Sequence, residues 1–219
     1  MKIGIICALD AELTPFVPHI KNVTTSTTAM LTFYTGHIED TPVVAVKCGV
    51  GKASAAIATQ ILIGQYGATA VINAGSAGGI DTKLNIFDAV VCTQSANHDA
   101  EEGTFSGDTL FVACETLVAT AKKAAANLQH NTHFGKMVTG DKFIDDEGRD
   151  SIIEKHNPLT VDMETASIAH ACHVNAIPYI SIRAISDTAA TPGMSNFMKN
   201  LDRAAVIAKD ITVELIGLL

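Results

Sequence analysis

The sequence carries little charge and few aromatic side chains, and it contains no tryptophan. Charged residues make up 17% of the 219 residues, with 15 Lys and Arg against 23 Asp and Glu, so the formal net charge is −8. Phosphate backbones and anionic membrane surfaces are bound through clustered positive charge. An acidic chain without a Lys/Arg block is therefore expected to bind neither nucleic acid nor a membrane, and its partner is expected to be small or neutral.

Cysteine is scattered along the chain, and no CxxC pair occurs. An odd number of dispersed cysteines indicates neither a disulfide framework nor a zinc ribbon, and it favours a reducing cytoplasm. The five cysteines are Cys7, Cys48, Cys92, Cys114 and Cys172. His170 and His173 lie on either side of Cys172, but no third ligand is close in sequence, so we expect no metal and no cofactor.

The sequence also lacks the common nucleotide and hydrolase motifs. The Gly49–Lys52 loop does not fit Walker A, because Val46 stands where a glycine is required and Ala53 where Ser or Thr is required. The glycines at 75–79 do not keep GxGxxG spacing, and there is no Gly-x-Ser-x-Gly elbow. Nucleoside triphosphate binding, dinucleotide binding and serine hydrolysis are therefore not supported.

Residues 53 to 80 form an uncharged stretch that is long enough to suggest a transmembrane helix. Glycine, glutamine and asparagine divide this stretch into pieces that are too short to span a bilayer. We interpret it as a buried helix followed by a buried strand.

Short apolar runs rich in β-branched residues alternate with longer helical stretches along the chain. Strands are expected at residues 2–7, 43–48, 70–73, 89–93, 134–139 and 177–185, and helices at residues 10–15, 53–66, 109–128, 146–156, 163–175 and 195–219. Continuous hydrophobic strands in this order predict an α/β fold, a single-domain three-layer sandwich with a mostly parallel or mixed central sheet flanked by helices. No linker or repeat divides residues 1–219, so one domain is expected.

In such sheets, ligands bind beyond the carboxyl ends of the strands, so polar residues that follow a strand are candidates. Glu12 follows the first expected strand, Ser76 the third and Asp187 the last. Ser76 is the one side chain of the 75–79 segment that can both donate and accept a hydrogen bond.

Arg183 interrupts an apolar strand, and a buried charge is costly unless it is paired. Glu164 at a helix start and Asp187 at the exit of the strand are candidate partners. Burial and mutual repulsion push the pKa values of clustered carboxylates apart, so that one acts as acid and another as base, as in glycosidic hydrolysis. Placement alone also allows Glu12, Glu164 and Asp187 to be unrelated surface acids.

Taken together, seven motifs resemble the 5′-methylthioadenosine/S-adenosylhomocysteine nucleosidases of the purine nucleoside phosphorylase superfamily. They occur in order from residue 1 to about residue 200: Ile3-Gly4-Ile5-Ile6 with Glu12, Gly49-Val50-Gly51-Lys52, Asn73-Ala74-Gly75-Ser76-Ala77-Gly78-Gly79, His98-Asp99, Thr139-Gly140-Asp141-Lys142-Phe143-Ile144, Val161-Asp162-Met163-Glu164 and Arg183-Ala184-Ile185-Ser186-Asp187. The resemblance implies a nucleoside phosphorylase-like fold and hydrolysis of the adenine N-glycosidic bond in methylthioadenosine, S-adenosylhomocysteine and, as a further expectation, 5′-deoxyadenosine. The products would be adenine and a 5-thio-substituted ribose.

The resemblance also implies a role for each carboxylate. Asp187 would be the acid that protonates N7 of adenine, with Ser76 holding that acid in place. Glu12 would activate water for attack at C1′, and Glu164 would bind the ribose hydroxyls.

The resemblance implies further substrate-binding residues. Phe143 would stack on adenine, and the backbone of Ile144 would bind its edge. Met163 and Phe197 would line the ribose and thio side, and Arg183 would support these residues. Leu9, Val50, Phe105 and Ser186 complete the expected substrate-binding residues.

Three departures from the family bear on these expectations. Leu9 stands where the family usually has Met, and Asp162 where Glu is common. The loop after Phe105 is short, so adenine-nucleoside hydrolysis is better supported than a particular 5′ substituent. The resemblance further implies a homodimer.

Two alternatives remain. One is a phosphate-dependent nucleoside phosphorylase of the same fold, although no Arg precedes Arg149 to hold phosphate. The other is a nucleoside-binding protein without turnover, against which the presence of all three carboxylates argues.

Overall fold

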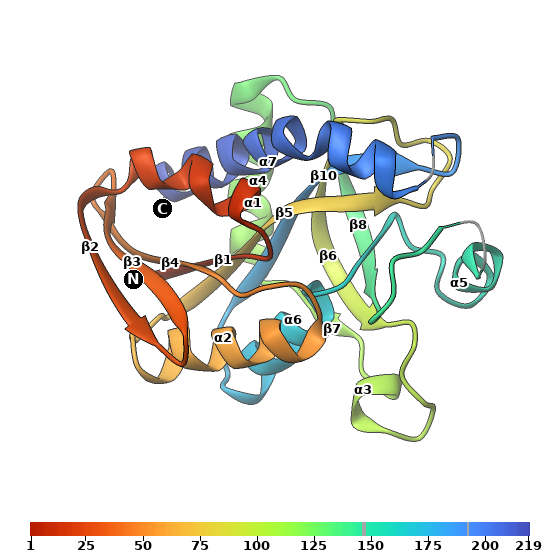
Figure 1. The fold of residues 1–219 in the computed structure, drawn as a ribbon, viewed down its shortest axis with the longest axis horizontal. Helices are drawn as coiled ribbons and strands as arrows, with labels where there is room; N and C mark the ends of the chain where they lie inside the picture. The colour runs from red at the N-terminus through yellow and green to blue at the C-terminus, as the bar shows by residue number, and fades with distance from the viewer. Residues whose placement is uncertain (146–147, 192) are drawn as a thin grey trace.

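The computed structural model describes residues 1–145, 148–191 and 193–219, and it places a ten-stranded sheet between two layers of helices (Figure 1). This confirms the α/β class and the layered architecture predicted from the sequence. The strands are β1 (Ile3–Cys7), β2 (Lys21–Thr28), β3 (Leu31–Ile38), β4 (Thr41–Lys47), β5 (Ala70–Gly79), β6 (Ala89–Asn97), β7 (Phe111–Val112), β8 (Thr132–Thr139), β9 (Thr160–Asp162) and β10 (Tyr179–Thr188).

The sheet is mixed, and its middle is parallel. The strand order is β10-β6-β8-β9-β5-β1-β4-β3-β2, with β7 beside β6. Strands β4, β1, β5 and β10 run parallel to one another, and β10 also pairs with both β5 and β6. The pairing of β10 with β5 curls this end of the sheet and brings the carboxyl ends of β1, β5 and β10 together.

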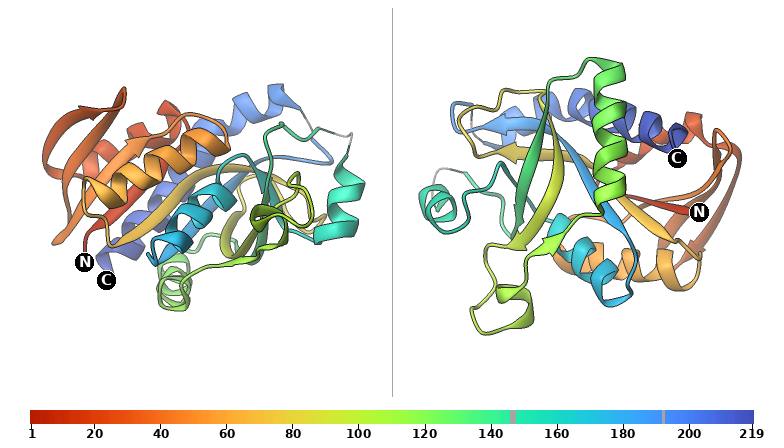
Figure 2. Two further views of the ribbon diagram at one scale, coloured as in Figure 1. Left: turned by 90° about the horizontal axis from the view of Figure 1, so that it is seen from below. Right: turned by 180° about the vertical axis from the view of Figure 1, so that it is seen from behind.

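Helices cover both faces of the sheet, and each face has its own apolar core. The helices are α1 (Asp10–Leu13), the 3-10 helix η1 (Thr14–His19), α2 (Lys52–Gly64), α3 (Phe105–Asp108), α4 (Glu115–Leu128), α5 (Arg149–His156), α6 (Thr165–Val174) and α7 (Met194–Gly217). Helices α1, α4 and α7 pack on one face over Ile3, Ile72 and Ile182, whereas α2 and α6 pack on the other over Ile6 and Val71. Figure 2 shows α2 and α6 side by side, across the sheet from α7.

Strand β2 and the start of α4 differ from the sequence expectation. Strand β2 is exposed along nearly its whole length, so its Thr-rich sequence shows no buried face, and the β2–β3 hairpin was not predicted. The expected helix at 109–128 begins only at Glu115, since Phe111–Val112 pairs with β6 as β7. The expected helix at 146–156 is found from Arg149 onward, and residues 146–147 lie outside the described residues.

Strands β5 and β10 continue beyond their expected ends. The glycine-rich segment at 75–79 was expected to be a loop, but it forms the last half of β5 and pairs with β10 through Gly79. Ser186 and Asp187 likewise lie inside β10 and not after it. Among the described residues, no helix is both long and apolar enough to cross a membrane.

Candidate active site

The predicted site residues converge on one cavity of about 410 Å³ at the carboxyl ends of β1, β5 and β10. Its volume falls within the range of about 300–1,000 Å³ that small-molecule sites occupy. The predicted residues that line it are Leu9, Glu12, Val50, Ser76, Phe143, Met163, Glu164, Arg183, Ser186, Asp187 and Phe197. Ile144 lines an adjoining pocket, which shares Phe143, Met163 and Asp187 with the cavity.

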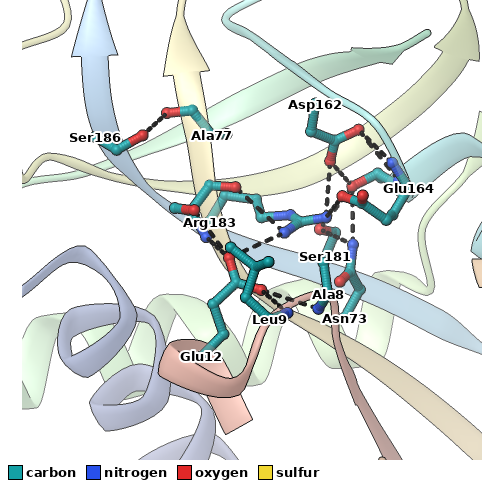
Figure 3. Close-up of polar contacts among 12 residues, drawn as sticks. Ala8, Leu9, Glu12, Asn73, Ala77, Asp162, Glu164, Ser181, Arg183 and Ser186 are labelled. Carbon is teal, nitrogen blue, oxygen red and sulfur yellow. Dashed lines mark hydrogen bonds and ion pairs between the residues drawn. The ribbon is translucent and has the colours of Figure 1, made fainter. Parts of the chain in front are cut away.

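Arg183 lies among the polar side chains of this cavity (Figure 3). It is 1% exposed. Its Nη2 lies 3.1 Å from Oδ2 of Asp162 and 3.1 Å from Oε2 of Glu164. Its Nη1 donates to the carbonyl oxygen of Ser76 at 3.2 Å and lies 3.9 Å from Oε1 of Glu12. Burial alone would lower the pKa of Arg183, but the surrounding carboxylates raise it above its ordinary value. The prediction that this buried arginine must be paired is confirmed.

Glu12 is held by four hydrogen bonds. The backbone N–H groups of Ala8 and Leu9 donate to its Oε2 at 2.9 and 3.1 Å, because α1 turns directly after β1. The backbone N–H and the Oγ of Ser76 both donate to its Oε1 at 2.8 Å. A carboxylate accepts at both oxygens, so these four donors fix the orientation of Glu12 within the cavity.

The close approach of Glu12 and Arg183 depends on Gly75. A Cβ atom at this position would lie 2.5 Å from Oε1 of Glu12 and 2.6 Å from Nη1 of Arg183. Any larger residue would therefore displace one of the two charged groups. The absence of a side chain at Gly75 thus lets both charged groups approach the backbone of β5.

Glu164 precedes α6 and is 4% exposed. Its Oε1 accepts a hydrogen bond from the backbone N–H of Gly51 at 3.0 Å, and its Oε2 accepts one from Nη2 of Arg183. Gly51 has φ +103°, a conformation that favours glycine, and it caps the start of α2. The carboxylate of Glu164 is thus bound at the start of this helix. Burial raises the pKa of Glu164 to about 7, although Arg183 acts in the opposite direction.

Asp162 is a site residue that sequence reasoning did not select. Its Oδ1 accepts hydrogen bonds from Oγ1 of Thr139 at 2.6 Å and from the backbone N–H of Glu164 at 3.2 Å. Its Oδ2 faces Arg183 and the hydroxyl of Thr165. The signal available in the sequence was the Asp-x-Glu spacing before a helix, but acidic residues are common there because they interact favourably with the helix dipole.

Asp187 is 2% exposed, and burial raises its pKa above the ordinary value for aspartic acid. The Oγ of Ser186 donates to Oδ1 of Asp187 at 2.9 Å. A bulge shifts the register of β10 between Ile185 and Asp187, which lets neighbouring residues contribute to one site. The expectation that Ser76 holds Asp187 is wrong: Ser76 bonds Glu12, and Ser186 takes the role expected of Ser76.

Two aromatic rings, those of Phe143 and Phe197, line the cavity together with Asp187. Phe143 follows β8, Phe197 lies in the first turn of α7, and their ring centroids are 6.1 Å apart in an edge-to-face arrangement. Met194, which the sequence did not indicate, also lines the cavity. A flat heteroaromatic ring fits a wall of this kind.

Phe105 does not line the cavity of its own chain. It lies in α3, is 52% exposed, and packs against His170 with a centroid distance of 4.8 Å. His170 and His173 contact aromatic rings here, and among the described residues no group of three or more His, Cys, Asp or Glu could hold a metal ion.

Three comparisons show which known proteins this chain is similar to. The model of the Phosphorylase superfamily matches residues 2–217. The 5′-methylthioadenosine/S-adenosylhomocysteine nucleosidase of Bacillus pumilus (strain SAFR-032) is 34% identical over 227 residues, which cover 99% of this chain and 98% of that protein.

Two crystal structures of nucleosidases with the same name also match over the whole chain. The protein from Colwellia psychrerythraea 34H, in complex with adenine, has a TM-score of 0.94 and 32% identity, covering 100% of this chain and 96% of its own. The protein from Neisseria meningitidis, in complex with methylthio-immucillin-A, has a TM-score of 0.95 and 29% identity, covering 100% and 99%.

Proposed function

Because the chain belongs to the phosphorylase superfamily, we propose that it hydrolyses the N-glycosidic bond of 5′-thio-substituted adenosines. The observation that carries the proposal is one cavity lined both by Asp187, which bonds Ser186, and by Glu12 and Glu164, which flank Arg183. Methylthioadenosine and S-adenosylhomocysteine are the expected substrates, and adenine is the common product. The relatives' names and their adenine and immucillin complexes support this substrate class.

Asp187 acts as the general acid in this proposal. Cleavage of the bond leaves negative charge on the purine, which a proton delivered to N7 neutralises. Burial raises the pKa of Asp187 and so keeps more of it protonated near neutral pH. Ser186 donates to Oδ1 and leaves Oδ2 available for the proton. The edge-to-face pair of Phe143 and Phe197 supports a stacking site for adenine beside this acid.

Glu12 and Glu164 act on the sugar side. Positive charge develops at C1′ as the bond breaks, and a nearby carboxylate stabilises that charge and accepts a proton from the attacking water. The four donors that orient Glu12 support it as this base. Glu164 binds the ribose hydroxyls, held between Gly51 and Arg183.

Arg183 favours hydrolysis over phosphorolysis, because its guanidinium group is already paired within the protein. It is the only Lys or Arg among the described residues that line the cavity. Its Nη1 and Nη2 groups already contact Ser76, Asp162 and Glu164, so the described lining of the cavity offers no further cation to hold a phosphate dianion.

Adenine release is the test of this proposal. Purified protein is incubated with methylthioadenosine or S-adenosylhomocysteine, with and without inorganic phosphate, and free adenine and the sugar product are measured. We expect adenine and a 5-thioribose at the same rate in both conditions. A requirement for phosphate, with a ribose 1-phosphate product, would indicate a phosphorylase. Tight binding without adenine release would indicate a nucleoside-binding protein.

We further propose that the protein is a homodimer of single-domain chains in the cytoplasm. Large apolar side chains are exposed on neighbouring elements α2, α3, β7 and α6, where a second copy would cover them. They are Ile57, Phe105, Val112 and Val174. In such a dimer Phe105 would reach the partner's cavity. Light scattering after size exclusion is expected to give twice the 23.0 kDa chain mass. The five free cysteines support a reducing compartment.

A further inference from the structure

The loop that carries Phe143 is fastened to the start of α2 by Lys52, a residue that does not line the cavity. Lys52 is the first residue of α2, and its Nζ lies 2.6 Å from Oδ1 of Asp99 and 3.3 Å from Oδ2 of Asp141. The backbone N–H of Asp141 donates to Oδ2 of Asp99 at 2.8 Å, and that of Lys52 donates to Oδ1 of Asp141 at 3.3 Å. These contacts hold the 140–144 segment against α2 and the end of β6.

The lysine in this cluster is well suited to hold the loop in place. Its side chain is 23% exposed, against 60% for Lys21 in the surface pair with Glu39, so solvent and salt screen the contact less. Burial alone would lower the pKa of Lys52, but hydrogen bonds and charge from Asp99 and Asp141 raise it above the ordinary value. Without the ammonium group, two carboxylates would face each other across the loop.

The same helix start also reaches the sugar side of the cavity. Gly51, the residue before Lys52, donates its backbone N–H to Oε1 of Glu164. Two consecutive residues therefore connect Glu164 to the loop that presents Phe143. The distance between Phe143 and Glu164 depends on this connection.

We propose that Lys52 is a positioning residue that sets the place of Phe143 relative to Glu164, and hence the fit of the base and sugar of one nucleoside. This inference rests on the proposed function. We call the contacts of Lys52 with Asp99 and Asp141 the clamp. Stacking on adenine contributes equally before and during bond cleavage, so loss of the clamp weakens substrate binding more than it slows the chemical step.

A fluorescence experiment tests the clamp without reference to catalysis. Because the chain has no tryptophan, Phe143→Trp places a single reporter on the loop. Adding Lys52→Met to this variant is expected to shift the emission to longer wavelength and lower the anisotropy. Adding Lys21→Met, which removes an exposed lysine of β2, is the matched control and is expected to change neither. Identical emission and anisotropy in all three proteins would overturn the proposal.

Kinetics on the chain with its native Phe143 test the consequence for substrate. For Lys52→Met we expect KM to rise about tenfold, within the ~10²-fold cost of a misplaced positioning group, and kcat to stay within about twofold. Lys52→Arg is expected to restore most of the affinity, and Asp99→Asn to behave like Lys52→Met. A purely structural role would lower the active fraction and kcat while KM stayed constant, and that result would also overturn the proposal. If the unsubstituted protein released no adenine, the proposed function would fail, while the fluorescence result would still decide the clamp.

Discussion

The Oγ of Ser76 lies 2.8 Å from Oε1 of Glu12 and donates to that carboxylate, in parallel with the backbone N–H of the same serine. One residue of β5 therefore supplies half of the donors that orient Glu12. Asp187, on the neighbouring strand, depends on a different serine, Ser186. The two carboxylates assigned opposite roles are thus held by separate hydroxyl groups, and the roles can be separated by mutation.

Ser76→Ala is expected to lower kcat by about tenfold, because a hydrogen bond to a charged group contributes about 1.5–3 kcal/mol and three donors to Glu12 remain. The alkaline limb of the pH–rate profile is expected to stay in place, since Asp187 keeps its own hydroxyl partner. Steady-state kinetics from pH 5 to 9 measure both quantities. If the alkaline limb moved in Ser76→Ala, Ser76 and not only Ser186 would affect the pKa of Asp187, which would contradict this assignment.

Ser186→Ala is the matched comparison. The hydrogen bond from Ser186 lowers the pKa of Asp187, in opposition to the larger effect of burial. Its removal raises the pKa further, so the protonated acid persists to higher pH and the alkaline limb moves upward. A downward shift, or a profile that matches the unsubstituted protein, would contradict the assignment of Asp187 as the acid that Ser186 holds.

Asp187→Asn is expected to reduce kcat by about 10²–10⁴-fold, the usual contribution of a general acid, because an amide cannot deliver the proton. Adenine-nucleoside binding is expected to survive, since Asn has nearly the same shape and Phe143 and Phe197 are untouched. Single-turnover kinetics and calorimetric titration with methylthioadenosine separate the two effects. Asp81→Asn, in the loop after β5, is the control for removal of a carboxylate from the same chain. Near-normal turnover in Asp187→Asn would exclude it as the acid.

The sequence predicted the identity of the charged residues better than their pairing. Glu12, Glu164 and Asp187 could be found because ligands bind at the carboxyl ends of strands in a parallel sheet. Arg183 could be found because a charge in an apolar strand needs a partner. The partner of Ser76 could not be found in this way. It depends on the extension of β5 through its glycines and on the bulge in β10. Neither feature produces a periodic pattern of hydrophobic residues that the sequence would show. The β2–β3 hairpin was missed for a similar reason, since β2 buries no face.

Arg183→Met is expected to destabilise the protein by about 3–5 kcal/mol, because it leaves Asp162 and Glu164 buried without their shared counter-charge. Urea unfolding, followed by circular dichroism, measures the change in the free energy of unfolding. Arg203→Met is the control: Arg203 lies 4.0 Å from the ring of Phe87 on the surface, and its loss is expected to cost about 0.5–1 kcal/mol. Equal costs for the two variants would show that the buried cluster does not depend on Arg183. Arg183→Lys, which keeps the charge but not the fork, is expected to fall between them.

Glu164 makes stability depend on pH in a direction opposite to that of most carboxylates. Burial raises its pKa to about 7 in the folded protein, against an ordinary value of 4.5. Between these two values the folded state binds more protons than the unfolded state, so the free energy of unfolding falls as pH rises. The contribution of Glu164 is therefore fully present below about pH 4.5 and is lost by about pH 7.

Glu164→Gln is expected to remove this dependence, because glutamine resembles the protonated acid at every pH. The variant and the unsubstituted protein should have similar stability near pH 5, and the variant should be more stable at pH 8 by about 3 kcal/mol, the equivalent of the pKa difference. Urea unfolding at a series of pH values measures the difference, in which the titration of all other groups largely cancels. Glu102→Gln, which removes an exposed partner of Lys155, is expected to give a difference that stays flat over the same range. A flat difference for Glu164→Gln as well, or one that favours the unsubstituted protein as pH rises, would mean that Glu164 is ionised in the folded protein throughout, with Arg183 and not burial controlling its charge.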